Sequence, residues 1–252
     1  MYKTNYPTNL TDKQWQVIEN ILDDQNTLRE IFNAILYLLK TGCQWRMLPT
    51  DFPKWELVYY YYSGWKEDGT FEEINEILRN MLRKQKGKHH SPGVGLIDAQ
   101  SVKTTRVGGG ERGYDGNKKV KGRKRHIITG TNGWLLSVVA HAANEHESQT
   151  GFQVMQTLQY RFDRMQKIYA DGGYRGELVD QVKNQLGWDM EITLRSDKET
   201  EFKPLPKRWV VERTFSWFEN FRRLAKDYEY TVSSSIAMIL LAFIAMALNN
   251  IS

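Results

Sequence analysis

The first third of the chain carries apolar residues every three or four positions, the spacing that places them on one face of a helix. Trp15 and Ile18 belong to the first such stretch, and Ile31 and Ile35 belong to the second. We predict a small bundle of four short helices with tryptophan side chains in its core. The predicted helices cover residues 15–22, 31–39, 55–65 and 71–83.

Three threonines are each followed, three residues later, by glutamine or glutamate. This spacing is typical of a capping box, in which the two side chains bond to each other's backbone amides at the start of a helix. A bundle of short helices fits a DNA-binding domain of the helix-turn-helix kind, and a purely structural bundle is the alternative. The predicted boxes are Thr11 with Gln14, Thr27 with Glu30, and Thr70 with Glu73.

The pattern changes after residues 84–93, a polar segment that ends in Pro92-Gly93 and is predicted to be a linker. Short apolar runs then alternate with helical stretches, and Asn132-Gly133 joins two of the runs as a β-hairpin turn. This order predicts a mixed α/β sheet with three early antiparallel strands and later parallel strands joined by helices. The predicted strands are 94–98, 126–130, 134–141, 167–171 and 188–194, and the predicted helices are 149–162, 176–186, one after Pro206, and 236–248.

Composition adds little to this picture. The 252-residue chain is 40% hydrophobic, enough to bury a core, and its net charge of +5 fits a polyanionic partner and a solvated basic surface equally well. A single cysteine, Cys43, excludes an intramolecular disulfide and fits a reducing compartment. The chain starts without an apolar signal segment, and the apolar run at 236–248 is too short to span a bilayer. We expect a cytoplasmic protein, not bound to a membrane, with a buried C-terminal helix.

Three carboxylates lie in sequence contexts that are typical of a catalytic site. Asp98 and Asp171 each end a short apolar run flanked by glycines, and Glu212 lies in the helix predicted after Pro206. Two aspartates at the ends of neighbouring strands and a glutamate on a helix can converge and hold hard divalent cations through oxygen. The alternatives are a turn-forming role for Asp98 and an ion pair between Glu212 and Arg208.

A basic, glycine-rich segment follows the Asp98 strand. Residues 106–126 contain eight lysines and arginines against Glu111 and Asp115, and their glycines provide little for a core. We predict a flexible loop whose positive charges contact a phosphate backbone. A solvated loop or a localisation signal is the alternative.

Six segments carry a resemblance to a known family. They are Thr41-Gly42-Cys43-Gln44-Trp45-Arg46-Met47-Leu48-Pro49, Ile97-Asp98-Ala99-Gln100-Ser101-Val102-Lys103, Gly122-Arg123-Lys124-Arg125-His126, Ala142-Ala143-Asn144, Ala170-Asp171-Gly172-Gly173-Tyr174 and Arg208-Trp209-Val210-Val211-Glu212-Arg213. In this order they resemble the DDE transposases of bacterial insertion sequences. The resemblance extends from about Leu10 to Asn249. It implies a ribonuclease-H-like mixed sheet flanked by helices over residues 94–252, preceded by a helical, DNA-binding domain over residues 1–83.

The resemblance also implies a mechanism. Asp98, Asp171 and Glu212 would form a catalytic triad that binds two Mg²⁺ or Mn²⁺ ions. A transposase of this group binds double-stranded DNA at the terminal inverted repeats of its element, cleaves there and joins the freed 3′ ends to target DNA by two-metal-ion phosphoryl transfer. The resemblance implies a homodimer or larger multimer on DNA, in the bacterial cytoplasm at the nucleoid.

Basic residues near the triad are predicted to contact DNA. Some relatives place a tyrosine, an arginine and a lysine around the glutamate; here Arg208 matches the arginine, whereas Leu205 and Glu219 occupy the other two positions. Arg213, Arg222 and Arg223 are candidates for the role of the missing lysine. The predicted DNA contacts are Lys103, Arg106, Lys118, Lys119, Lys121, Arg123, Lys124, Arg125, Arg175, Arg208, Arg213, Arg222 and Arg223.

Two other functions stay open. One is an inactive, domesticated derivative that regulates by binding DNA, although the presence of all three carboxylates argues against it. The other is a nuclease of the same fold that cleaves without joining ends. The triad fits both chemistries of an active enzyme, so a strand-transfer assay is needed to separate them.

Overall fold

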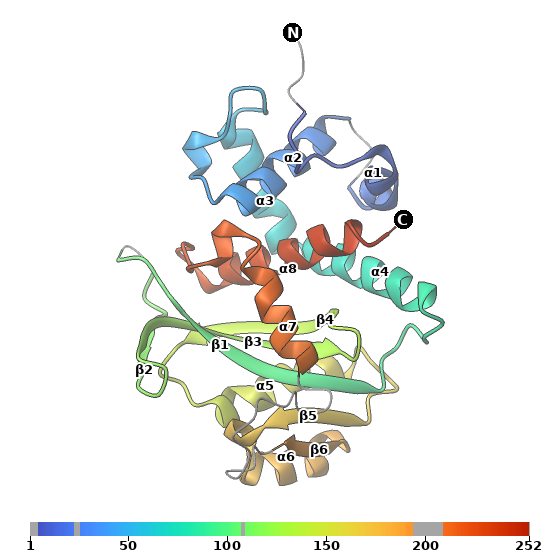
Figure 1. Cartoon of the computed structure of the whole chain (residues 1–252), viewed down its shortest axis with the longest axis vertical. Coiled ribbons are helices and arrows are strands. Elements are labelled where there is room, and N and C mark those ends of the chain that lie inside the picture. Colours follow the sequence, from blue (N-terminus) through green and yellow to red (C-terminus); the bar gives the residue numbers. More distant parts are fainter. Residues whose placement is uncertain (1–4, 23–25, 107–108, 194–208, 252) are drawn as a thin grey trace.

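The computed structural model describes residues 5–22, 26–106, 109–193 and 209–251, and it places a sheet between two helical layers (Figure 1). In chain order the elements are α1 (Asp12–Ile18), η1 (Glu19–Ile21), α2 (Asn26–Thr41), η2 (Trp45–Met47), α3 (Trp55–Glu67), α4 (Thr70–Gln85), β1 (Val94–Lys103), β2 (Gly113–Asp115), β3 (Val120–Gly130), β4 (Leu135–Ala142), α5 (Glu147–Gln159), β5 (Lys167–Asp171), η3 (Gly172–Tyr174), α6 (Glu177–Leu186), β6 (Asp189–Thr193), α7 (Trp209–Phe218), η4 (Arg222–Leu224) and α8 (Val232–Leu248).

Within the described residues, six strands form one mixed sheet. β1 runs antiparallel to one edge of β3, while β2 and then β4 pair with successive parts of the other edge. β5 and β6 extend the sheet beyond β1 in parallel. The turn between β3 and β4 contains Gly133 at φ 87°, a left-handed value that favours glycine. The predicted mixed sheet, with its early antiparallel and later parallel strands, and the predicted hairpin are confirmed.

Apolar cores cover both faces of the sheet. Ile97 and Ile128 belong to the core formed with α5 and α6, whereas their neighbours Leu96 and Ile127 belong to the core formed with α7 and α8. Adjacent residues therefore point to opposite faces, as the pleat of a strand requires. Figure 1 shows α5 and α6 on one side of the sheet and α7 across the other.

The C-terminal helix α8 connects the sheet to the N-terminal helices. It packs against β4 and α4, and its side chains share one apolar core with those of α1 to α4 (Figure 1). The predicted buried C-terminal helix is confirmed. This shared core contains residues from both sides of the predicted linker, so it marks no domain boundary there. The division into 1–83, 84–93 and 94–252 stays a prediction. In the part of the chain that the structure describes, every helix is too short or too polar to span a membrane.

Two strand predictions need correction. Residues 106–126 are not a loop throughout, because β2 spans Gly113–Asp115 and β3 begins at Val120. Basic residues can occupy this strand because each face supplies polar partners for its buried charges. β1 is also longer than predicted, since it continues past Asp98 to Lys103.

One capping box is confirmed and two are wrong. Thr11 caps α1 and makes both bonds of the box with Gln14. Thr27 lies inside α2, which begins at Asn26. The N-cap of α4 is Gly69, and the Thr70 hydroxyl donates to Asp68 at 2.6 Å instead.

Candidate active site

A polar pocket of about 310 Å³ lies where β1 and β5 separate. The two strands pair as far as Leu96 and Tyr169; β5 then ends at Asp171, while β1 continues to Lys103 along β3. Extending this register by two residues places Asp98 level with Asp171, and both aspartates line the pocket. Ligands of α/β sheets bind outside the carboxyl ends of parallel strands, where neighbouring strands diverge. The structure therefore brings two of the three predicted carboxylates together.

Local backbone geometry orients both aspartates. Asp171 caps η3 and accepts a hydrogen bond from the Gly173 amide at 2.9 Å. Asp98 accepts one from the Ala99 amide at 2.7 Å. By the alternation of their strands, both residues belong to the face that α7 covers.

Glu212 lies on α7, which packs against β1 on this same face (Figure 1). Thr214, two residues further along α7, donates to the carbonyl of Gly133 at 3.1 Å and so ties the helix to the β3–β4 turn. The described residues that line the pocket do not include Glu212. Within the described ranges, no three His, Cys, Asp or Glu side chains lie close enough together to hold a metal ion. The structure thus places the helix of the third carboxylate over the strand of the first, without bringing all three side chains into the pocket.

Lys124 and Glu147 add opposite charges to the pocket. Lys124 reaches it from β3, and Glu147 is the first residue of α5. The Lys124 ammonium lies 3.6 Å from Glu147 Oε1 and 3.5 Å from Asp115 Oδ2, and it donates to the carbonyl of Glu145 at 3.2 Å. Sequence reasoning missed Glu147, although it follows Ala142-Ala143-Asn144, one of the segments that carry the resemblance.

Asp115 anchors the turn between β2 and β3. Ser101 Oγ donates to it at 2.6 Å, and the amides of Asn117 and Lys118 donate at 3.0 Å. Burial by itself raises the pKa of Asp115, but these hydrogen bonds and the charge of Lys124 outweigh burial and lower the pKa to about 2. The ionised carboxylate therefore holds the turn that carries Lys118 at the rim of the pocket.

Two buried rings lie beside these charges. The hydroxyl of Tyr174 is 3.2 Å from Nδ1 of His126. Burial raises the pKa of Tyr174 well above its ordinary value, and the negative charges of Asp98, Glu147 and Asp171 raise it further. Burial lowers the pKa of His126 well below its ordinary value, with smaller contributions from the nearby side chains of His141 and Lys124. Both rings are therefore neutral near pH 7 and add no charge to the pocket.

The predicted DNA contacts fall into distinct surroundings. A groove of about 450 Å³ beside β1 and β3 is lined by several of them, together with Arg112 and the exposed ring of Tyr114. Arg175 and Arg222 are exposed elsewhere, and Arg208 lies outside the described residues, as does Leu205. The predicted contacts that line this groove are Lys103, Arg106, Lys119 and Lys121, while Lys118 lies in the carboxylate pocket.

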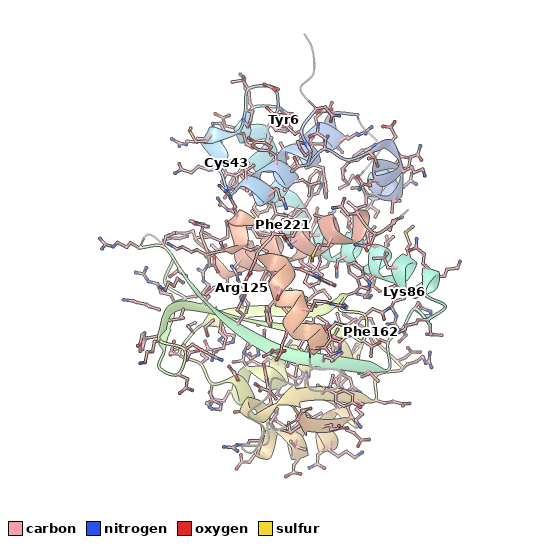
Figure 2. All side chains as sticks on the ribbon, in the orientation of Figure 1. Tyr6, Cys43, Lys86, Arg125, Phe162 and Phe221 are labelled. Carbon is pink, nitrogen blue, oxygen red and sulfur yellow. The ribbon has the colours of Figure 1, made fainter. Side chains whose placement is uncertain are left out.

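Three arginines among the predicted contacts are buried and bound by the protein itself, as Lys124 is in the carboxylate pocket. Arg123 donates to Asp227 Oδ1 at 3.2 Å and to two backbone carbonyls at 2.8 and 2.9 Å. Arg125, labelled in Figure 2 between the sheet and the C-terminal helices, donates to a carbonyl at 2.9 Å. Arg223 bonds to Glu229 at 2.6 Å. Because these guanidinium groups are inaccessible and already bound, we leave all three out of the proposed DNA interface.

The remaining candidates for the missing lysine differ in accessibility. Arg213 stacks between the rings of Trp209 and Trp217, at 4.6 and 4.7 Å, and donates to the carbonyl of Asn132 at 3.1 Å. These contacts hold α7 in place, and they engage the guanidinium group of Arg213 that would otherwise contact a phosphate. Arg222 is exposed on η4.

Comparison with known proteins decides the family. Residues 89–249 match the family described as "Transposase DDE domain", and residues 10–75 match the family described as "Putative transposase of IS4/5 family". The chain belongs to the DDE transposases of insertion sequences. Its mixed sheet flanked by helices is the ribonuclease-H-like fold expected of this family. The resemblance inferred from the six sequence segments is confirmed.

A curated relative of the transposase is similar over a shorter stretch. It is the "Putative transposase for insertion sequence element IS402" of Burkholderia cepacia, which is 30% identical over 116 residues. The match covers 43% of this chain and 54% of the relative, so the chain spans about half the length of that protein. This likeness supports the family independently of the site.

Proposed function

We propose that this transposase binds the terminal inverted repeats of its insertion sequence, cleaves the DNA at the element ends and joins the 3′ ends to target DNA. The observation that carries the proposal is the meeting of Asp98 and Asp171 in one pocket at the fork of β1 and β5. The packing of the Glu212 helix against β1 supports the third member of the triad.

Asp98, Asp171 and Glu212 are the residues that would hold two Mg²⁺ or Mn²⁺ ions. The donor set fits, because hard divalent cations prefer carboxylate oxygen, and both aspartates line a polar pocket. Bound there, such ions would activate a water or a DNA 3′-hydroxyl and stabilise the oxygen that leaves the phosphodiester.

The surroundings of the pocket position the DNA. Lysines and arginines of the adjacent groove contact phosphates, which fixes the duplex without reading its sequence. Asp115 holds the β2–β3 turn so that Lys118 faces the pocket. The N-terminal helices, which match the IS4/5 family, recognise the inverted repeat, and two or more copies of the chain assemble on the DNA in the bacterial cytoplasm at the nucleoid.

A strand-transfer assay tests this function. The protein is incubated in Mg²⁺ with labelled linear DNA that carries the inverted repeats of its own element and with an unlabelled circular target. The proposal predicts cleavage at the repeat and label covalently joined to the circle. Cleavage without joined product would favour the nuclease, and binding without cleavage would favour the inactive regulator.

A further inference from the structure

Glu147 is a carboxylate of the pocket to which the proposed triad gives no role. It lines the pocket together with Asp98 and Asp171. Its Oε2 lies so close to Gly173 that a Cβ added there would clash with this oxygen and would lie 3.1 Å from Asp171 Oδ1. Glu147 and Asp171 therefore approach the same point from two different elements, and the absence of a side chain at position 173 makes this approach possible.

The charge of the pocket favours an additional cation. The described residues that line it include four carboxylates, those of Asp98, Asp115, Glu147 and Asp171, but two ammonium groups. One ammonium, that of Lys124, is only 7% exposed and lies between Asp115 and Glu147.

The two carboxylates beside Lys124 differ in their other bonds. Asp115 receives hydrogen bonds from Ser101 Oγ and from two backbone amides, so its charge is already stabilised. Glu147, the first residue of α5, places its Oε1 3.6 Å from the ammonium of Lys124. It lies on the side of the pocket nearest Asp171. Lys124 therefore balances the charge of Glu147 from the Oε1 side, while Oε2 lies toward Gly173 and Asp171.

We propose that Glu147 is a further carboxylate of the divalent-cation site and that Lys124 is its counter-ion when the cation is absent. The inference rests on the proposed function and extends the set of cation-binding carboxylates from three to four. Divalent-cation binding exchanges the ammonium of Lys124 for the cation at Glu147. Lys124 is thus a competitor that lowers the affinity of the site.

Direct cation binding tests the proposal without relying on activity. The full-length protein, without DNA, is titrated with Mn²⁺ while free Mn²⁺ is followed by electron paramagnetic resonance. Glu147→Gln should weaken binding about tenfold or more, within the range seen when groups around a metal are altered. Lys124→Met should tighten binding, because the competing positive charge is removed.

Glu145→Gln is the matched control. Glu145 lies two residues before Glu147, and its carboxylate is 3.5 Å from His141. Its contact with Lys124 is made by the backbone carbonyl, which the substitution leaves in place. Mn²⁺ affinity should not change in this variant.

Asp98→Asn separates a failure of the Glu147 inference from a failure of the proposed cation site itself. Wild-type affinity in Glu147→Gln with weak binding in Asp98→Asn would mean that Glu147 merely holds Lys124, which overturns this inference and leaves the proposed function intact. Wild-type affinity in both variants would overturn the proposed cation site itself. If Glu147→Gln fails to fold, Lys124→Met is the deciding test. Unchanged Mn²⁺ affinity in that variant would contradict the proposed exchange of the Lys124 ammonium for a divalent cation.

Discussion

Successive residues of β3 direct positive or titratable side chains to opposite faces of the sheet. These side chains have different surroundings on the two faces. Arg123 and Arg125 belong to the face of the C-terminal helices, where they are 0% and 1% exposed and bonded to the protein. Lys124 and His126 belong to the face of α5, beside the carboxylate pocket and its buried tyrosine. The two arginines thus hold the fold together, while Lys124 and His126 lie beside the candidate active site.

The physical difference lies in the partners that each face supplies. On the helical face, the segment between η4 and α8 offers backbone carbonyls and the buried carboxylate of Asp227, so the guanidinium of Arg123 is fully satisfied. On the opposite face, Lys124 meets carboxylates at the edge of a pocket. A charge saturated by its own protein stabilises structure, whereas a charge beside a pocket can exchange its partner for a ligand.

Removing the buried ion pair on the face of the C-terminal helices should give the largest effect on stability. Arg123→Ala leaves the carboxylate of Asp227 buried without its ion pair, and loss of one partner of such a pair costs about 3–5 kcal/mol. Urea unfolding measures the change. Lys121→Ala is the control, because Lys121 lies two residues earlier on the same side of β3 but is exposed, so its loss should change the unfolding free energy by less than about 0.5 kcal/mol. Equal stability of Arg123→Ala and wild type would contradict the structural role of the buried pair.

The exposed basic groove should affect DNA binding rather than stability. Replacing Lys119 and Lys121 together by alanine should weaken binding to all DNA sequences and reduce the slope of log K against log salt by about 0.9 for each phosphate that the protein no longer neutralises. Binding is measured over a series of salt concentrations. Lys183→Ala removes a comparable exposed charge from α6 and should leave the slope unchanged. An unchanged slope in the double variant would show that the groove is merely solvated.

A smaller effect is expected from acid titration of Asp115. Its folded pKa of about 2 lies below the ordinary value of 3.8, so the stability it contributes is fully present above about pH 4 and is lost as the pH falls toward 2. The unfolding free energy of Asp115→Asn should therefore be lower than that of wild type at pH 7 and vary less with pH between 4 and 2.

Urea unfolding at several pH values measures this difference. Asp180→Asn, at an exposed position of α6, should follow the wild-type curve. Parallel curves for Asp115→Asn and wild type would mean that the hydrogen bonds of Asp115 do not stabilise the folded state.

Local signals predicted much of this molecule. The Thr11 capping box, the turn at Gly133 and the apolar run that ends in Asp171 depend on residues close in sequence, and the structure confirms each of them. The first half of β3 was predicted as a loop because its charges are satisfied by distant partners, such as Asp227, which lies 104 residues from Arg123. Glu147 was missed for a similar reason, since it reaches the pocket only when α5 packs against the sheet.

The central claim is that the carboxylates at the fork of β1 and β5 perform metal-dependent cleavage. Asp98→Asn tests it most directly, because the amide keeps the size of the side chain but removes the charge that a divalent cation needs. Cleavage of repeat-ended DNA in Mg²⁺ is compared with wild type at concentrations where a gel-shift assay shows equal DNA binding. The account predicts that the variant binds DNA normally and does not cleave it. Near-normal cleavage by Asp98→Asn would contradict the account.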